Sequence, residues 1–129
     1  MNSKAIGEVS EAVILGHLAK LGNNVLIPFG NNQRYDLVIE KDGKFIRGQC
    51  KTARIRLGCA IFQCSSTNGF TGKKTSYHGQ VEVFWVYCPE NGKIYQVPVS
   101  ETKSTQTNLR IDQPKGMRKA IKWARDYEI

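Results

Sequence analysis

The chain has 129 residues, of which 40% are hydrophobic, and a formal net charge of +8. This length and composition predict a single domain with one core, and the charge favours a polyanionic partner. No apolar run approaches the ~18 residues of a membrane span and no leader peptide is visible, so we expect an intracellular, cytoplasmic protein with no membrane partner.

The first predicted element is a helix that has Ser3 as its N-cap, runs to about Leu21 and stops at Gly22. Apolar residues at helical spacing give this helix a broad hydrophobic face. Glu8 and Glu11 are three residues apart and therefore lie on one side of it. They either favour the helix dipole from solvent or point into a functional site.

A short strand is predicted next, from Asn24 to Phe29, because this run is apolar, contains β-branched residues and is bounded by Gly and Asn. The loop from Gly30 to Arg34 follows. Its small polar residues would allow the backbone to approach a phosphate closely, although ordinary turn chemistry explains the loop equally well.

Residues 35–52 carry the clearest pattern in the chain. Two alternating runs of apolar and polar residues flank Asp42 and Gly43, a dipeptide that suits a two-residue type I′ turn. The segment is therefore predicted to be a β-hairpin, and counting outward from the turn sets Ile39 against Ile46.

The same count places Asp36 opposite Gln49 at the open end of the hairpin, with Lys51 two residues along on the same face. Asp36 and the Gln49 amide oxygen are hard ligands that suit Mg²⁺, and Lys51 could hold or polarise an attacking water. These groups suit phosphodiester hydrolysis. The alternative is an ordinary exposed hairpin face.

After the hairpin, Arg54 and Arg56 alternate with Ile55, and a brief strand is predicted from Cys59 to Cys64. Residues 65–80 show no core pattern and are predicted to form a long loop. Loops of this length inside a small domain are typically functional or mobile.

Residues 81–88 predict a strongly apolar strand, and a turn at 89–92 leads into a second strand at 93–99, so that the two form a hairpin. The aromatic residues of the first strand are Phe84, Trp85 and Tyr87. They indicate either a central strand covered on both faces or a surface used between subunits.

The remaining residues comprise a Ser/Thr-rich connection at 100–107, a short segment at 108–111 and a predicted helix at about 115–127. Arg118, Lys122 and Arg125 would form a basic stripe along that helix, either contacting phosphates or simply solvated. The order of elements predicts an α/β or α+β fold with a mixed central sheet flanked by helices.

Cysteine spacing argues against a zinc site. Cys50, Cys59, Cys64 and Cys88 form no CxxC pair, and the two histidines, His17 and His78, lie far from them in the sequence. Reduced, buried thiols are therefore expected, as in other intracellular proteins.

Asp36, the hairpin and the sequence Gln49-Cys50-Lys51 together resemble the PD-(D/E)XK nuclease superfamily. The resemblance is to the branch that contains a group I intron homing endonuclease, in which Gln stands at the second acidic position, and more distantly to archaeal Holliday junction resolvases. Two positions depart from the motif: Tyr35 replaces its proline, and Gln49 removes one negative charge from the metal site.

The resemblance implies a restriction-endonuclease-like fold and a Mg²⁺-dependent DNA endonuclease in which Mn²⁺ substitutes. The implied catalytic residues are Asp36, Gln49, Lys51, Glu8 and Glu11, and the implied metal ligands are Asp36, Gln49, Cys50, Glu8 and Glu11. A homing-type enzyme is the leading expectation. A Holliday junction resolvase and a DNA-binding module with a decayed site are the alternatives, and Gln49 keeps the last one open.

The expected partner is double-stranded or branched DNA, bound by a homodimer or homotetramer because paired cuts need paired sites. Candidate nucleic-acid contacts are cationic, aromatic or imidazole side chains: Arg34, Arg54, Arg56, Lys73, Lys74, Tyr77, His78, Arg118, Lys122 and Arg125.

Overall fold

The computed structural model of the chain describes residues 1–116 and 120–129. Its elements, in chain order, are α1 (Ser3–Lys20), β1 (Asn24–Leu26), β2 (Leu37–Lys41), β3 (Lys44–Thr52), β4 (Arg54–Arg56), β5 (Cys59–Gln63), β6 (Ser65–Thr67), β7 (Lys74–Ser76), β8 (Val83–Cys88), β9 (Lys93–Pro98), the 3₁₀ turn Val99–Glu101, β10 (Gln106–Arg110) and the 3₁₀ turn Ala124–Asp126.

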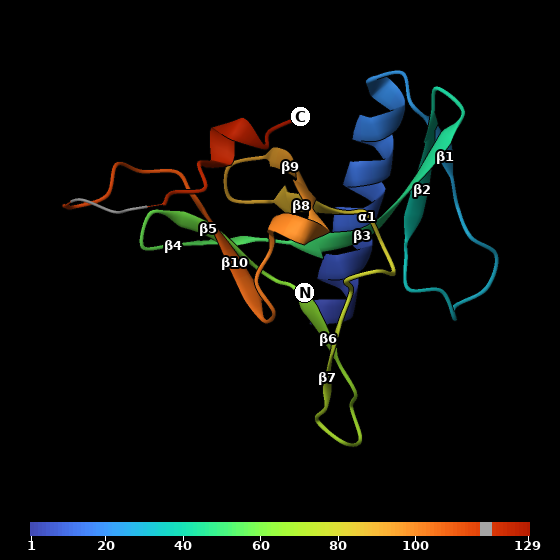
Figure 1. The fold of residues 1–129 in the computed structure, drawn as a ribbon, viewed down its shortest axis with the longest axis horizontal. Helices are drawn as coiled ribbons and strands as arrows, with labels where there is room; N and C mark the ends of the chain where they lie inside the picture. The colour runs from blue at the N-terminus through green and yellow to red at the C-terminus, as the bar shows by residue number, and fades with distance from the viewer. Residues whose placement is uncertain (117–119) are drawn as a thin grey trace.

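A mixed five-stranded sheet in the order β1-β2-β3-β8-β9 forms the centre of the molecule (Figure 1). β3 and β8 run parallel, and the other neighbours are antiparallel. A separate antiparallel sheet has the order β10-β5-β4, and β6 pairs only with β7.

The two faces of the central sheet have separate hydrophobic cores. On one face α1 packs through Ile14 and Leu18 against side chains that include Ile39 and Trp85. On the other face the β10-β5-β4 sheet packs through residues such as Phe62 against Phe84 and its neighbours. The result is three layers, helix, sheet and sheet, with β3 and β8 in the middle.

Helix α1 follows the sequence pattern closely, with one change at its start. The N-cap is Asn2 instead of Ser3, because the Asn2 side chain accepts a hydrogen bond from the Ala5 backbone N–H at 2.8 Å. Gly22, just beyond the helix end, has φ +92°, a left-handed conformation that a glycine adopts without strain. The predicted stop is therefore confirmed.

The first strand is shorter than the sequence predicts. β1 ends at Leu26, and Ile27 and Phe29 are exposed beyond it, Phe29 completely. Only Asn24 to Leu26 of β1 pair with β2. The rest of the predicted strand therefore continues into a surface loop.

The predicted structureless loop at 65–80 contains a hairpin, formed by β6 and β7. The expectation of a long loop is wrong for this stretch. Its strands are polar and lack the apolar alternation by which a half-buried strand is recognised.

The aromatic strand is confirmed as β8, and its side chains are used inside this chain. Phe84 and Trp85 are fully buried on opposite faces of the central sheet. The interpretation of these residues as surface for a subunit interface is therefore wrong for Phe84 and Trp85, while Tyr87 is only partly buried.

The predicted C-terminal helix at 115–127 is wrong. The described part of this segment is irregular and ends in a 3₁₀ turn, and the predicted contact Arg118 lies outside the described residues. Backbone hydrogen bonds to other strands replace helical ones: Arg110 N–H donates to the Lys122 carbonyl, and Gln96 N–H donates to the Tyr127 carbonyl. Tertiary pairing has overridden a helical apolar pattern.

None of the helices in residues 1–116 and 120–129 is both long and apolar enough to cross a membrane. All four cysteines are free, with Cys64 and Cys88 buried and Cys50 and Cys59 partly exposed. The predicted burial of the thiols is thus confirmed for two of the four.

Candidate active site

The β2–β3 hairpin has the register that its turn predicts. Asp42 (φ 53°) and Gly43 (φ 76°) are both left-handed, as a type I′ turn requires. Ile39 pairs with Ile46, and both contribute to the core beneath α1. The hairpin is therefore anchored by its apolar face, and the opposite face is available for chemistry.

Asp36 lies immediately beyond the last pair of this ladder, Leu37 with Gly48. Its backbone N–H donates to the Gly48 carbonyl at 2.9 Å, and its carboxylate accepts the Cys50 backbone N–H at 2.9 Å. The predicted ladder pair of Asp36 with Gln49 is not formed. The chain shifts by one residue at this point, and the carboxylate is held against the middle of the Gln49-Cys50-Lys51 sequence.

Side chains alternate along β3, so its two faces differ. Cys50 packs in the core that contains α1, whereas Lys51 reaches the opposite face, where its ammonium lies 4.8 Å from the centre of the Tyr77 ring. Gln49, two residues before Lys51, is on the Lys51 face and half-buried. The alternation of side chains along β3 agrees with the predicted common face for Gln49 and Lys51, and the role of Gln49 stays a prediction.

Burial lowers the pKa of Lys51, and the nearby Asp36 carboxylate opposes this effect. Burial also raises the pKa of Asp36, against the Cys50 N–H hydrogen bond and the Lys51 charge, which lower it. The two groups are thus close enough to affect each other's ionisation while both are partly removed from water.

Of the two acidic residues on α1, Glu11 is the one whose charge interacts with Asp36. Its pKa is raised first by burial, then by repulsion from Asp36 and from Glu8. Glu8 is exposed, one turn earlier on the helix. The structure therefore places Asp36 near both Glu11 of α1 and Lys51 of β3.

The donors around Asp36 are oxygens of the kind that a hard divalent cation prefers. Two carboxylates that repel each other form a centre of negative charge, and a cation would relieve that repulsion. Within the described residues, however, no three Cys, His, Asp or Glu side chains are grouped so that they could hold a metal. A metal here would need neutral ligands as well, and the Gln49 amide is the side chain that the sequence offers.

Cys50 is an unsuitable thiolate ligand. Burial, followed by repulsion from Asp36 and Glu11, raises the pKa of its thiol well above the ordinary value. Any contribution of Cys50 to a metal would therefore have to come from its backbone carbonyl.

Two of the predicted nucleic-acid contacts are engaged within the protein instead. The Arg34 guanidinium donates to Ser66 Oγ at 2.7 Å, to the Ser76 carbonyl at 3.0 Å and to Gln80, and it stacks on the Tyr77 ring at 4.0 Å. Tyr77 is only 4% exposed, so its ring does not present a face to a base. Sequence reasoning missed this cluster because its members are far apart in the chain.

The other predicted contacts are spread over separate surfaces. Lys73, Lys74 and His78 are exposed on or beside the β6–β7 hairpin, and Arg54 and Arg56 are exposed on β4. Arg125 stacks on Trp123, with its guanidinium carbon 4.4 Å from the ring centre. The predicted basic stripe of Lys122 and Arg125 along a helix is absent, because no helix forms in the described part of that segment.

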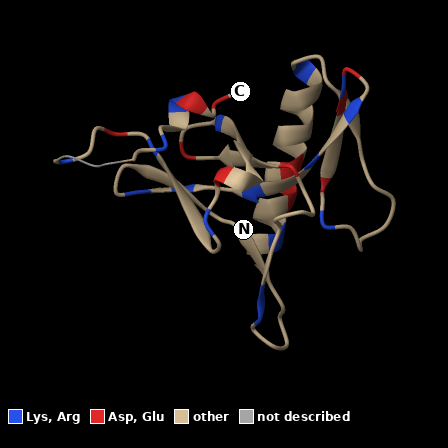
Figure 2. Cartoon of the chain, in the orientation of Figure 1, with Lys and Arg blue, Asp and Glu red and all other residues tan. Residues whose placement is uncertain are grey.

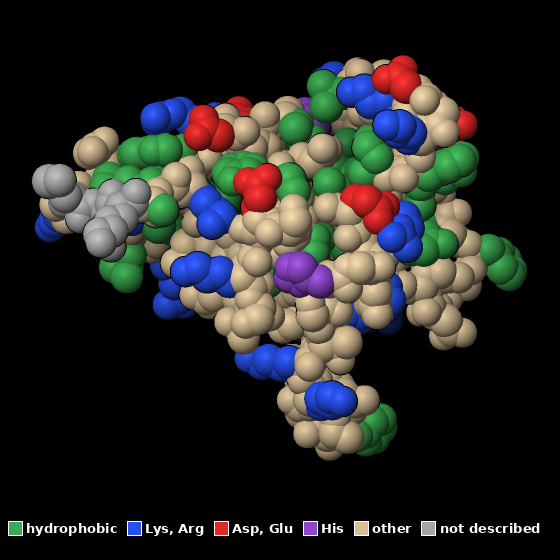
Figure 3. Space-filling model, in the orientation of Figure 1, with side chains coloured by type: hydrophobic (Ala, Val, Ile, Leu, Met, Phe, Trp, Pro, Cys, Tyr) green, Lys and Arg blue, Asp and Glu red, His purple; other side chains and the backbone are tan. Residues whose placement is uncertain are grey.

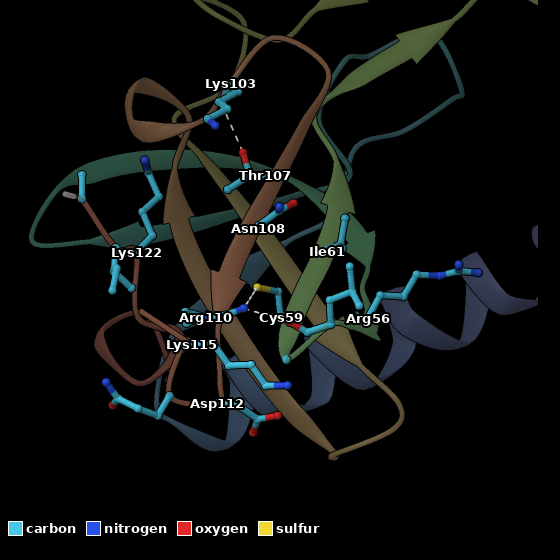
Figure 4. A pocket seen from close by; sticks show the side chains of 15 residues that line it. Arg56, Cys59, Ile61, Lys103, Thr107, Asn108, Arg110, Asp112, Lys115 and Lys122 are labelled. Carbon is cyan, nitrogen blue, oxygen red and sulfur yellow. Dashed lines mark hydrogen bonds between the residues drawn. The ribbon is translucent and has the colours of Figure 1, made fainter. Parts of the chain in front are cut away.

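A basic hollow of about 850 Å³ lies on the β10-β5-β4 sheet (Figure 4), and neither Asp36 nor Lys51 is among its lining residues. Its charged lining comprises Arg56, Lys103, Arg110, Lys115, Lys122 and a single acidic residue, Asp112. Arg110 is tied to its floor, since it donates to the Leu57 carbonyl at 2.8 Å and to Cys59 Sγ at 3.1 Å. The hollow adds positive surface but contains none of the acidic groups of the candidate site.

We expect the metal-free protein to lose stability as the pH rises through the elevated pKa of Asp36. The unfolded carboxyl titrates near its ordinary value of 3.8, so the folded state holds the proton more tightly. The contribution of Asp36 to the free energy of unfolding is therefore complete below pH 3.8, and it is lost as the pH rises through the higher pKa of the folded carboxyl. Urea denaturation of wild type and Asp36→Asn over a range of pH measures this, and the variant should show a flatter dependence.

Asp42→Asn is the matched control, because Asp42 is an exposed carboxylate in the hairpin turn and Asn also tolerates its left-handed conformation. An identical pH dependence in wild type and Asp36→Asn would contradict the burial of an ionisable carboxyl at this position.

Comparison with known proteins identifies a family and a solved structure with a similar fold. A family model described as PD-(D/E)XK endonuclease matches residues 1–129. The solved structure of a bacterial homing endonuclease, I-Ssp6803I, superposes with a TM-score of 0.77 and 22% sequence identity, covering 99% of this chain and 89% of that chain. No curated protein matches. The restriction-endonuclease-like fold is confirmed, with one long helix on the sheet among residues 1–116 and 120–129, where flanking helices were predicted.

Proposed function

The chain belongs to the PD-(D/E)XK endonuclease family, and from this premise we propose that it is a Mg²⁺-dependent DNA endonuclease of the homing type, acting inside the cell. The observation that carries the proposal is the grouping of Glu11, Asp36 and Lys51 at the open end of the β2–β3 hairpin, where each group alters the environment of another. The similarity in fold to a bacterial homing endonuclease supports the choice of the homing type.

In this proposal Asp36, Glu11 and the Gln49 amide oxygen hold Mg²⁺, or Mn²⁺ in its place, with the Cys50 carbonyl as a further donor and Glu8 adding negative charge from one turn away. Such a cation supplies Lewis-acid stabilisation of the charge that develops on the scissile phosphate. The partly buried carboxylates of Asp36 and Glu11, which repel each other, are the feature of this chain that fits a cation.

Lys51 orients the attacking water and offsets negative charge as the phosphodiester bond is broken. Its ammonium is partly desolvated and lies near the Tyr77 ring and the Asp36 carboxylate, so it is held in place before substrate arrives. An ammonium group that is already in position does not have to reorganise during the reaction, and this is the condition for effective electrostatic catalysis.

Replacing Gln49 with Glu is expected to maintain or strengthen metal binding, because a carboxylate is a better ligand than an amide for a hard cation. Calorimetric titration with Mg²⁺ in the absence of DNA measures this directly. Gln63→Glu, at an exposed position on β5, is the matched control for added negative charge. Weaker metal binding in Gln49→Glu than in the control would mean that the Gln49 side chain points away from Asp36.

Cleavage assays test the proposal and separate it from its alternatives. Wild-type protein is incubated with linear duplex and with four-way junction DNA, with EDTA and then with Mg²⁺ added back. Cleavage of linear duplex at defined sites, abolished by EDTA and restored by Mg²⁺, is the expected result. Preferential cutting of junctions would favour a Holliday junction resolvase, and binding without any cutting would favour a decayed binding module.

Paired cuts on two strands need two copies of the site, so we propose a homodimer or homotetramer. One 14.5 kDa chain also offers little surface for a long target, since specific DNA interfaces bury roughly 1,000 to 2,500 Å² of protein. Sedimentation equilibrium at micromolar protein, with and without DNA, checks this. A mass that stays at one chain under both conditions would exclude the paired-site mechanism.

A further inference from the structure

The β6–β7 hairpin stands apart from both sheets. β6 pairs only with β7, and the hairpin projects from the body of the molecule (Figure 1). Every residue of β7 is exposed, and β6 is buried only at Ser65, where it leaves the body. A two-stranded ribbon of this kind is at best marginally stable in water by itself, so its order must come from its base and its tip.

Both ends of the β6–β7 hairpin, a two-stranded ribbon, are fixed by hydrogen bonds. At the base, Arg34 joins the two strands, since it donates to Ser66 Oγ on β6 and to the Ser76 carbonyl on β7. At the tip, the Asn68 side chain accepts the N–H groups of Phe70 and Thr71. The ribbon is therefore held as a unit, although almost none of its side chains is packed.

The exposed chemistry of the ribbon suits a polyanion. Residues 65–80 contain no Asp or Glu but carry Lys73 and Lys74, and Figure 2 shows the hairpin with basic and without acidic positions. Phe70 is fully exposed in the turn between the two strands, where no packing within the described part of the chain accounts for an aromatic ring. Figure 3 shows hydrophobic surface at the tip of the projecting hairpin. Between the tip and the base, the strands present the exposed hydroxyl groups of Thr67 and Thr75 on opposite faces of the hairpin, because Thr67 pairs with Lys74 and Thr75 with Ser66.

The ribbon is also connected to the candidate active site. Tyr77 directly follows β7, and its ring lies under the Lys51 ammonium, at 4.8 Å. The phosphate that reaches Lys51 therefore lies beside the base of the ribbon. The major groove of B-DNA, about 12 Å wide, admits a two-stranded β-ribbon, in which hydroxyl groups can bond to base edges and an apolar side chain can contact a thymine methyl group.

We propose that the β6–β7 hairpin enters the major groove of duplex DNA next to the scissile phosphate and reads its base sequence there. It enters the groove tip first, so that Phe70 at the tip and Thr67 and Thr75 on the two faces contact base edges, while Lys73 and Lys74 contact the flanking phosphates. This inference rests on the proposed DNA endonuclease function and adds to it the element that selects the target.

Binding selection from a pool of randomised DNA duplexes, without Mg²⁺ so that cutting plays no part, tests the inference. The triple variant Thr67→Ala, Phe70→Ala, Thr75→Ala leaves Arg34, Tyr77 and both lysines in place. It is expected to relax base preference at a few adjacent positions by about tenfold per base pair, with little change in affinity for non-selected duplex. Phe45→Ala, which removes an exposed aromatic ring on β3, is the matched control and should select the wild-type sequences.

A second variant separates base reading from phosphate contact. Lys73→Gln combined with Lys74→Gln should weaken binding to all duplexes alike and lower the slope of log affinity against log salt by about 2, with base preference unchanged. Circular dichroism and thermal denaturation confirm that each variant is folded.

The outcomes are distinct for the two proposals. A triple variant that selects the same sequences as wild type overturns the role of the hairpin, whether or not the wild type cuts DNA. Wild-type protein that selects a sequence but never cuts DNA overturns the endonuclease proposal alone. Protein that binds no duplex at all overturns both.

Discussion

Asp36→Asn is expected to abolish DNA cleavage, with a loss on the order of 10³-fold or more, while duplex binding stays nearly intact. The substitution keeps the shape of the side chain, and the amide oxygen can still accept the Cys50 N–H that the carboxylate accepts at 2.9 Å. Only the negative charge is lost, and with it the ability to hold a cation. Lys51→Ala should give a similar loss, because it removes the ammonium beside the same site.

Single-turnover cleavage and fluorescence anisotropy measure the two effects separately. Asp42→Asn provides the same chemical change at an exposed position of the same hairpin and should cut DNA at the wild-type rate. Contacts made by Lys and Arg elsewhere on this basic chain are expected to carry the affinity in every variant. Wild-type turnover in either Asp36→Asn or Lys51→Ala would refute the site assignment.

Gly48→Ala is expected to cost about 3 kcal/mol or more of folding free energy, the upper end of the range for overpacked cores. A Cβ at this position would lie 2.2 Å from Cζ3 and 2.3 Å from Cε3 of the Trp85 ring. The ring cannot move aside, because Trp85 is fully buried and its indole N–H donates to the Gln96 side chain at 2.9 Å. Since small domains are stable by only about 5–15 kcal/mol, much of the total would be lost.

Urea denaturation gives the size of this effect, and two variants interpret it. Gly7→Ala on α1 is the control, because a Cβ there meets nothing within 4 Å and alanine favours a helix. It should leave stability unchanged or raise it slightly. The double variant Gly48→Ala, Trp85→Leu should lose less free energy of unfolding than the sum of the losses in the two single variants, because the smaller side chain removes the clash. Near-wild-type stability of Gly48→Ala would show that β3 and β8 can move apart.

The sequence predicts best those features that depend on neighbours in the chain. The Asp42-Gly43 turn fixes the pairing of Ile39 with Ile46 through local backbone conformation, and the confirmed register followed from counting residues. Counting failed only at Asp36, where the chain shifts by one residue at the end of the ladder, and such a shift depends on the local hydrogen bonds instead of the side-chain pattern.

Features that depend on distant partners were missed. The β6–β7 hairpin is ordered by Arg34, more than 30 residues earlier, and has no apolar alternation to reveal it. The segment at 115–127 has helical spacing of apolar residues, yet its backbone pairs with Gln96 and Arg110 instead. In the candidate site, the coupling of Glu11 to Asp36 became visible only when α1 was placed on the sheet.

The parallel pairing of β3 with β8 governs how the protein reaches its native state. The β2–β3 hairpin is local and can form in microseconds, whereas β3 and β8 meet only after the intervening residues 53–82 have closed into a crossover. Tyr77 belongs to that crossover. During folding, Asp36 and Lys51 can therefore come together early, but Lys51 acquires its aromatic neighbour only in the slow step that joins the two halves of the central sheet.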